Sequence, residues 1–210
     1  MKLVGKELLL EQSDIIETIE FTNDSIEKKF IVKGGKWWVE DGALIGENKE
    51  NLPAIILSKM DYHGNIMLDF EAATILPCTH DINAMIQLTW DEEKDLRGLG
   101  YVAGIQGWWN GKTGIEKSPQ YKLNVMTPLF QFVPGQKYRI QFGSIEGHIF
   151  LIVDHELILE IMDPDPINHH CGGRIGFEAY CSKIRIENVM IRGIAYKELE
   201  ETYTYEGVSS

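Results

Sequence analysis

The sequence has no long hydrophobic run and no excess of positive charge. The apolar stretch Leu8–Leu10 is too short for a signal peptide and Glu11 follows it at once, so we expect neither a secretion signal nor a membrane span. Acidic residues outnumber basic ones by 32 to 20, which gives a formal net charge of -12. Because such a charge repels phosphate backbones and anionic lipids, we expect no nucleic-acid partner and no membrane partner.

Cysteine is also scarce, and its spacing does not suit a disulfide framework. The chain has only Cys78, Cys171 and Cys181, an odd number without a CxxC pair. This pattern is typical of thiols in a reducing compartment, so we expect a cytoplasmic protein. The sequence His169-His170-Cys171 does not predict a metal site, because neighbouring residues of an extended chain point to opposite sides.

Short alternating runs predict an all-β fold. In segments 66–72, 138–142 and 184–187, apolar and polar residues alternate as they do in strands with one buried face. The run Ile149–Val153 is apolar on both faces, which favours a central strand, and Asp154-His155 fits a two-residue hairpin turn after it. Turn residues separate many such runs, so the sequence predicts a two-sheet antiparallel β-sandwich.

The chain is expected to form one domain, 1–210, because its 44% hydrophobic and 25% charged residues are ordinary for a globular protein. No repeat or shift in composition marks a boundary. We expect the terminal segments, about 1–20 and 195–210, to be peripheral. Only two stretches suggest helices, Ser13 to Glu20 behind an N-cap at Ser13 and Tyr196 to Thr202.

Several motifs resemble one family of jelly rolls. The segment from Trp37 to Gly46 is similar to the Trp-x-x-x-Asp-Gly-x-Leu-x-Gly opening of bacterial jelly-roll domains. Three further segments, 81–84, 138–163 and 173–191, resemble the YesU-like branch of the concanavalin A-like lectin/glucanase superfamily. Together these motifs span about Lys36 to Ile194.

The resemblance implies a concanavalin A-like jelly roll with a concave face, and a role in polysaccharide or glycoside breakdown in bacteria. Relatives include hydrolases of 3-keto-glycosides. A structural calcium ion on the convex face is common among relatives, although nothing in this sequence identifies its ligands, and no other cofactor is expected. Two departures stand out: the usual Asn-Gly turn is Asp154-His155, and the Glu-x-Asp-x-x-Glu signature of retaining glucanases is absent. The second departure argues against a laminarinase-type activity.

One segment combines the flat aromatic faces and the amide groups that sugar recognition requires. Gly107 and Gly111 bracket its two tryptophans, so we predict an aromatic-tipped loop that contacts the ligand. The alternative is that a tryptophan merely plugs the end of the sandwich. The candidate residues are Tyr101, Gln106, Trp108, Trp109 and Asn110.

A row of polar residues is the second candidate. Asp81, Asn83 and Gln87 share one face of a predicted strand, with Trp90 on the opposite face, and would line a groove beside His80. The alternative is a plain solvated face, or an Asp81 that caps a turn and an Asn83 that satisfies a loop backbone.

Glu178 and Tyr180 form the third candidate, because an acidic residue beside an aromatic one is unusual in an otherwise apolar strand. If Glu178 lies buried in the concave cleft, its pKa rises and it is able to act as a general acid or base. Asp81 is the candidate for a second carboxylate. The alternative is that Glu178 is an ordinary outward-facing residue.

Three functions stay open at this point. The first is a protein that binds or processes a carbohydrate, with an oligosaccharide or glycoside as its partner. The second is a glycosidase-like or lyase-type enzyme that acts on a modified sugar, for example a 3-keto sugar, through Glu178 and/or Asp81. The third is an accessory subunit that docks a partner enzyme; a homo-oligomer is compatible with all three.

The predicted aromatic loop is tested by Trp108→Ala and Trp109→Ala. If the tryptophans form a sugar platform, each variant loses affinity for the ligand and keeps its melting temperature, because an exposed side chain adds little to the core. A tryptophan that plugs the core instead costs about 3–5 kcal/mol of stability when truncated. Ligand titration and thermal unfolding of the same variants separate the two cases.

Overall fold

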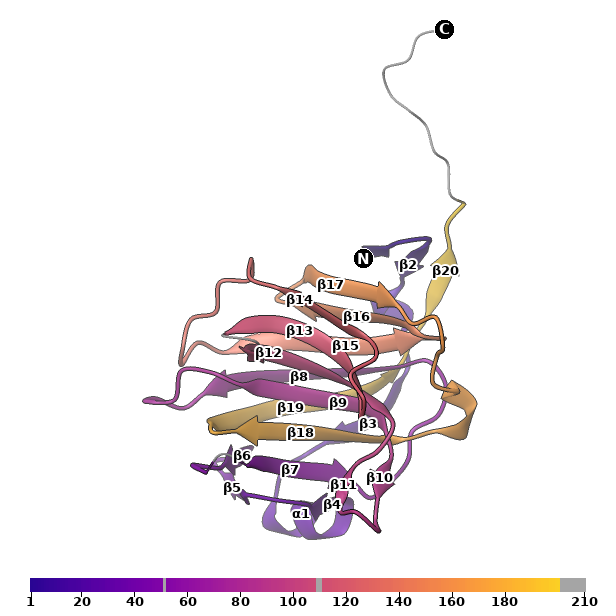
Figure 1. Cartoon of the computed structure of the whole chain (residues 1–210). Coiled ribbons are helices and arrows are strands. Elements are labelled where there is room, and N and C mark those ends of the chain that lie inside the picture. The colour runs from indigo at the N-terminus through magenta and orange to yellow at the C-terminus, as the bar shows by residue number, and fades with distance from the viewer. Residues whose placement is uncertain (51, 109–110, 201–210) are drawn as a thin grey trace, which may run out of the picture.

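The computed structural model describes residues 1–50, 52–108 and 111–200, and Trp108 only by its backbone. Two large antiparallel sheets stack face to face (Figure 1), which confirms the predicted jelly-roll sandwich. The order in the seven-stranded sheet is β14 (Asn124–Thr127), β13 (Lys112–Ser118), β12 (Gly100–Trp108), β9 (Ile82–Leu88), β18 (Arg174–Tyr180), β7 (Pro53–Ser58) and β4 (Phe30–Val32).

The second sheet has eight strands. Its order is β17 (Glu156–Met162), β16 (His148–Val153), β15 (Tyr138–Ile145), β8 (Ile66–Thr74), β19 (Lys183–Gly193), β6 (Ala43–Glu47) and β5 (Lys36–Glu40), with β3 (Ile15–Ile19) paired to β19. Two small sheets complete the fold: β1 (Lys2–Leu3) with β2 (Lys6–Leu8) and β20 (Tyr196–Glu198), and the hairpin of β10 (Trp90–Asp91) with β11 (Leu96–Arg97).

The core lies between the two large sheets, where alternate residues of each strand meet. Leu68 and Phe70 of β8 point into it, as the alternation predicts, while Asp69 points to the outer face. Phe70 contacts Phe177 of the opposite sheet edge to face, with ring centroids 5.1 Å apart. The same alternation holds in β15. It also holds in β19 on each side of a bulge at Asn188, which shifts it by one residue between Ile186 and Val189.

The outer face of the eight-stranded sheet is partly covered by the small sheet of β1, β2 and β20. Phe150 and Ile152 of β16 pack there against Leu3 and Leu8, which explains why the run Ile149–Val153 is apolar on both faces. The next two residues, Asp154 and His155, have φ of 47° and 70° and turn the chain into β17, as predicted.

The two helix predictions were wrong where the structure describes them. Residues after Ser13 form strand β3, whose isoleucines suit a ladder with β19, and the only α-helix of the described residues is α1 (Asn23–Lys29). Thr22 caps it, with a capping box that includes Ser25. Short 3₁₀ turns occupy Leu10–Gln12 and His169–Cys171. At the C-terminus, Tyr196 begins strand β20, and residues 201–202 lie outside the described part.

The hairpin of β10 and β11 folds over the outer face of the seven-stranded sheet. There Trp90 packs on an apolar cluster that includes Met85 and Leu88 of β9. The sequence placed Trp90 opposite Asn83, which was wrong because a bulge at Gln87 (φ 51°) breaks the alternation before the chain reverses. None of the helices in the described part is long and apolar enough to cross a membrane.

Packing between the sheets is tested by Phe177→Ala. Phe177 is fully buried against Phe70, so its truncation leaves a cavity and should cost about 3–5 kcal/mol in the free energy of unfolding. Leu129→Ala is the control, because Leu129 is 81% exposed and should change stability by less than about 0.5 kcal/mol. Urea unfolding measures both, and equal effects would contradict this account of the core.

Candidate functional site

A polar row crosses the outer face of the seven-stranded sheet beside the hairpin. Asn83 of β9 pairs with Gly104 of β12 on one side and with Glu178 of β18 on the other. Gly104 in turn pairs with Gly114 of β13, so two neighbouring positions of the row carry no side chain. Glu116, two residues further along β13, shares the face of Gly114 because strand residues alternate.

Arg97 joins two of the carboxylates on this face. Its Nη1 donates to Oε2 of Glu178 at 2.9 Å and lies 3.8 Å from Oε1 of Glu116. Both distances start at the same nitrogen. Oε2 of Glu178 and Oε1 of Glu116 are therefore no further apart than the sum of these two distances. Arg97 arrives on the hairpin, and its side chain is 19% exposed. Tyr121, about half exposed, also interacts with this guanidinium.

Glu116 is the most deeply buried acid of the group. Its side chain is 0% exposed, and neither carboxylate oxygen has a hydrogen-bond partner. Burial raises its pKa to about 8, against the opposing effect of Arg97 and with a smaller contribution from the negative charge of Glu178. Burial therefore favours the protonated form of this carboxyl group at neutral pH.

Glu178 and Asp81 are buried as well, but both have partners. Burial raises the pKa of Glu178 to about 7; Arg97 lowers it and Asp81 raises it further. Burial also raises the pKa of Asp81 to about 6, although its Oδ2 accepts from the backbone N–H of Tyr180 at 2.7 Å and from Nδ2 of Asn83 at 2.8 Å. The site thus holds three carboxyl groups whose protons leave near neutral pH.

This arrangement of carboxyl groups is able to bind a ligand and to exchange protons with it. Titratable groups with strongly raised pKa values are enriched at functional sites, because burying them costs stability that packing alone does not return. Besides the oxygens of Glu116, the buried Oδ1 of Asn83 lacks a partner. Unpartnered buried polar atoms on one face favour a site that is completed by hydrogen-bonding groups from outside the chain.

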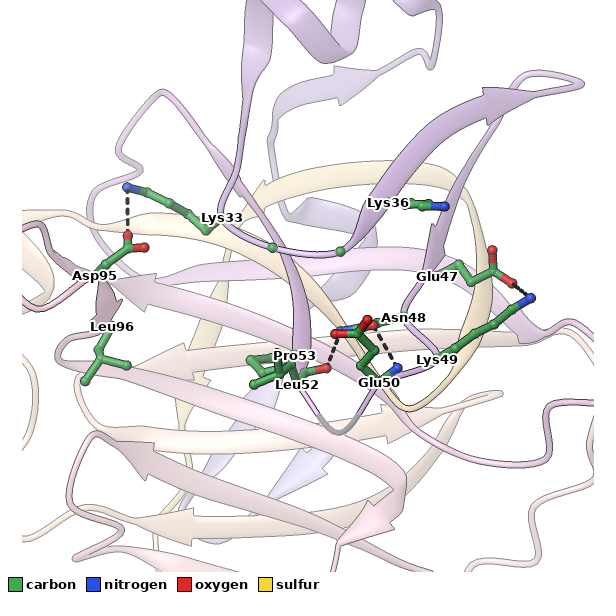
Figure 2. A pocket seen from close by; sticks show the side chains of 12 residues that line it. Lys33, Lys36, Glu47, Asn48, Lys49, Glu50, Leu52, Pro53, Asp95 and Leu96 are labelled. Atoms are coloured by element: carbon green, nitrogen blue, oxygen red, sulfur yellow. Dashed lines mark hydrogen bonds and ion pairs between the residues drawn. The ribbon is translucent and has the colours of Figure 1, made fainter.

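A pocket of about 640 Å³ lies beside the hairpin, and Figure 2 shows side chains that line it. Asp95 and Leu96 of the hairpin and Pro53 of β7 are among the residues that line it. Pro53 pairs with Tyr180 in the ladder, two residues along β18 from Glu178, although the charged residues of the row do not themselves line the pocket. Lys33 ties the hairpin to the sheet through Glu92, with Nζ and Oε2 2.8 Å apart.

The structure brings four of the predicted residues together. Asp81, Asn83, Glu178 and Tyr180 are joined by hydrogen bonds and by ladder pairs across β9 and β18. Asp81 has φ of 70° and packs so closely on Gly107 that a Cβ there would lie 1.7 Å from Oδ1. Gly107 is therefore required by this close approach.

Tyr101 does not belong to the site, and its assignment to an aromatic loop was wrong. It is 0% exposed in the core, and its hydroxyl donates to Oδ2 of Asp163 at 2.8 Å and accepts from the N–H of Ile167 at 3.1 Å. The reason is that β12 starts at Gly100, so the glycine-bracketed segment begins as a central strand.

The other predicted residues lie at the margins. Gln87 sits in the bulge of β9, buried, with both amide atoms unpartnered. Gln106 lies where the pairing of β12 with β13 shifts, with φ of 59°. His80 lies in the loop before β9 and lines a separate pocket. The side chain of Trp108, and Trp109 and Asn110 altogether, lie outside the described residues.

Sequence reasoning missed Arg97 and Glu116. Arg97 follows the charged stretch 91–95, which is typical of a solvated loop, and nothing local shows that it folds back over the sheet. Glu116 carried a weak signal, since it alternates with the apolar Ile115 after Gly114. Within the described ranges, no three His, Cys, Asp or Glu side chains gather closely enough to hold a metal ion.

The raised pKa of Glu116 predicts a pH-dependent stability. Its pKa is about 8 in the folded chain and 4.5 as its ordinary value, so the folded state keeps the proton that the unfolded state loses. The stabilising effect is present below the ordinary value and lost as pH rises through the folded pKa. Glu116→Gln should therefore flatten the fall in stability between about pH 5 and about pH 9. Urea unfolding at a series of pH values tests this against Glu93→Gln, which alters an exposed acid on the hairpin; equal slopes in both variants would refute it.

Comparisons with known proteins support the jelly-roll fold. Neither the protein-family models nor the curated proteins gave a match. Among solved structures, the carbohydrate-binding module CBM66 from Bacillus subtilis is similar with a TM-score of 0.59 and 12% identity, over 78% of this chain and 95% of that one. A Bacillus subtilis protein of unknown function with a galectin-like fold has a TM-score of 0.64 and 13% identity, over 88% and 99%. The alginate lyase Aly36B, solved as a mutant with an alginate trisaccharide, has a TM-score of 0.54 and 13% identity, over 87% and 98%. The chain therefore shares the galectin-like jelly-roll fold found in carbohydrate-binding and carbohydrate-processing proteins.

Proposed function

We propose that the outer face of the seven-stranded sheet binds an oligosaccharide or glycoside. The observation that carries this proposal is the group of Glu116, Arg97 and Glu178, with unpartnered buried acceptors beside it. Sugar hydroxyls both donate and accept, so one hydroxyl is able to pair with the guanidinium of Arg97 and with a carboxylate oxygen.

Aromatic faces and space support the same ligand. Tyr121 and Tyr180, 49% and 38% exposed, come from loop and strand positions next to Arg97 and Glu178. Partly exposed rings suit the C–H faces of a sugar. The neighbouring pocket of about 640 Å³ lies within the range of ligand sites and gives room for more than one sugar unit. The three similar structures reported above are a carbohydrate-binding module, a galectin-like protein and an enzyme solved with a trisaccharide, which supports a carbohydrate ligand.

A second candidate is an enzyme at the same site, favoured by the different protonation of the two glutamates. Glu116 is protonated at neutral pH, as a general acid must be, whereas Glu178 titrates near pH 7 beside Arg97. Glycosidases use a pair of carboxyl groups about 5–10 Å apart. The acid–base pair proposed here is Glu116 with Glu178, with Asp81 as the neighbour that raises the pKa of Glu178.

The finer assignments rest on the sequence motifs. We propose membership of the YesU-like branch and a part in bacterial polysaccharide or glycoside breakdown, because the motifs from Trp37 to Ile191 resemble that branch. The cysteine pattern supports a reducing compartment. An accessory subunit would bind sugar poorly, and the following titration tests that part of the alternative.

Glu178→Gln tests the proposal. It preserves the shape of the side chain but removes the charge that pairs with Arg97, so affinity for the best ligand should fall at least tenfold. Isothermal titration against a panel of neutral, acidic and keto-sugar oligosaccharides gives the affinities, and chromatography of the same mixtures detects products. Glu93→Gln, an exposed change on the same hairpin, should bind like the unaltered protein.

The two candidates differ in the behaviour of Glu116→Gln. A binding protein forms no product in any variant. An enzyme keeps its binding in Glu116→Gln and loses about 100-fold or more of its turnover, because the general acid is gone. The carbohydrate proposal is refuted if no sugar of the panel binds, or if Glu178→Gln and Glu93→Gln bind with the same affinity.

A further inference from the structure

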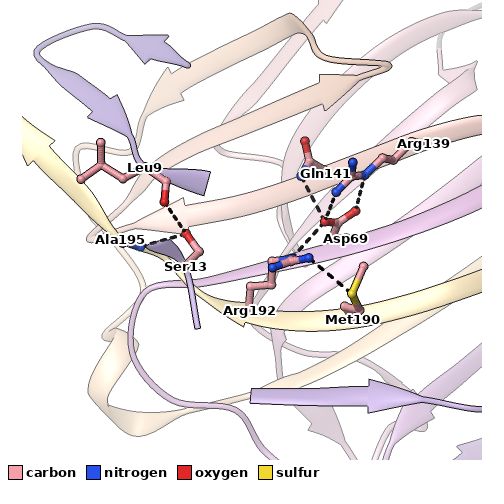
Figure 3. Close-up of polar contacts among 8 residues, drawn as sticks. All are labelled: Leu9, Ser13, Asp69, Arg139, Gln141, Met190, Arg192 and Ala195. Atoms are coloured by element: carbon pink, nitrogen blue, oxygen red, sulfur yellow. Dashed lines mark hydrogen bonds and ion pairs between the residues drawn. The ribbon is translucent and has the colours of Figure 1, made fainter. Parts of the chain in front are cut away.

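A second polar site lies on the outer face of the eight-stranded sheet, on the opposite side of the molecule from the carboxylate group. Asp69 of β8 is 1% exposed there and accepts four hydrogen bonds (Figure 3). Nε and Nη2 of Arg139 donate to its two oxygens at 2.9 and 2.8 Å. Nε2 of Gln141 and Nε of Arg192 donate to Oδ2, both at 3.1 Å.

Asp69 accepts one bond at Oδ1 and three at Oδ2, whereas both arginines keep further N–H donors. A carboxylate has about four lone-pair positions, and each guanidinium has five N–H donors. Arg139 uses Nε and Nη2 on Asp69, and Arg192 uses Nε on Asp69 and Nη2 on the sulfur of Met190. Among the contacts of the described residues, Nη1 of each arginine remains for a further acceptor. The buried carboxylate therefore orients two guanidinium groups without using up their donors.

Both arginines line a small cavity. Its volume is about 130 Å³, several times the share of one water molecule in the liquid, and Asp69, Gln141, Glu11 and His155 also line it. The side chain of Arg192 is 17% exposed and that of Arg139 is 38% exposed, so both reach this space from the wall of the sheet. A small ligand is able to approach them from solvent.

The charges around the cavity favour an anion. At its centre two guanidinium groups face a single carboxylate, although the chain as a whole carries a net charge of -12. Two further acids act on Arg139. Glu71 is paired with Lys137 at 3.0 Å, and Glu11 lies exposed on the rim, where its charge opposes an anion but is weakened by water. Arginine pairs with carboxylates and phosphates through parallel N–H bonds, which a chloride ion does not reproduce.

We infer that this cavity is a binding site for a small oxyanion, a carboxylate or a phosphate group, held between Arg139 and Arg192. The site is independent of the carbohydrate face, because the core separates the two outer surfaces. Its ligand accepts from the Nη1 groups, and His155, in the turn between β16 and β17, also lines the cavity.

Titration with sodium acetate and with inorganic phosphate at pH 7, at constant ionic strength, tests the inference. Isothermal titration should show saturable binding of at least one of them, and the one that binds identifies the group as carboxylate or phosphate. Arg192→Gln should lose at least tenfold in affinity. Asp69 keeps its two hydrogen bonds from Arg139 in this variant, so β8 and β15 stay linked. Arg185→Gln is the matched control, since it removes the same charge from the same strand at a residue that pairs with Glu187 outside the cavity.

A variant with the opposite effect makes the test independent of folding defects. Glu11→Gln removes an exposed negative charge from the rim and should raise the affinity for the anion. The inference is overturned if neither acetate nor phosphate binds, if Arg192→Gln and Arg185→Gln lose affinity equally, or if Glu11→Gln brings no gain. Carbohydrate binding is unchanged in Arg192→Gln, so failure here is distinguishable from failure of the proposed function.

Discussion

The structure depends on one constraint, that two sheets share a single core and each strand gives alternate side chains to it. Phe177 and Ile115 point into that core, so their neighbours Glu178 and Glu116 must point to the outer face. On the other sheet, Leu68 and Phe70 fix the outward direction of Asp69 in the same way. Both polar sites therefore follow from the packing of apolar residues one position away.

Burying carboxyl groups on the outer face costs free energy unless each group has an ionic or hydrogen-bond partner, and the strands of the sheet do not provide enough such partners. The hairpin of β10 and β11 supplies one such partner, since it covers the face and brings Arg97 to within 2.9 Å of Glu178. The compensation is incomplete: Glu116 lies 3.8 Å from the same nitrogen, and its oxygens have no hydrogen-bond partner. A fold selected for stability alone would replace this acid with an apolar residue, so the residual cost fits a functional role.

The two outer faces hold inverse arrangements of the same chemistry. On the seven-stranded sheet, one guanidinium serves two carboxyl groups, which leaves protons and acceptors for a ligand with hydroxyls. On the eight-stranded sheet, one carboxylate serves two guanidinium groups, which leaves N–H donors for an anion. A sandwich with a shared core allows these two sites to coexist, because the core separates them and keeps their charges apart.

The all-β sandwich could be predicted from the sequence, since the alternation in β8, β15 and β19 and the turn at Asp154-His155 are local properties. It also singled out Asp81, Asn83 and Glu178, polar residues in or beside apolar strands, which the structure brings together. Three features became known only from the folded chain. Tyr101 belongs to the core, and a bulge at Gln87 brings Trp90 to the same face as Asn83. Arg97 contacts residues that lie 19 and 81 positions away in the chain. Register, bulges and the folding-back of a hairpin depend on long-range pairing, which a one-residue shift reverses, so no local pattern specifies them.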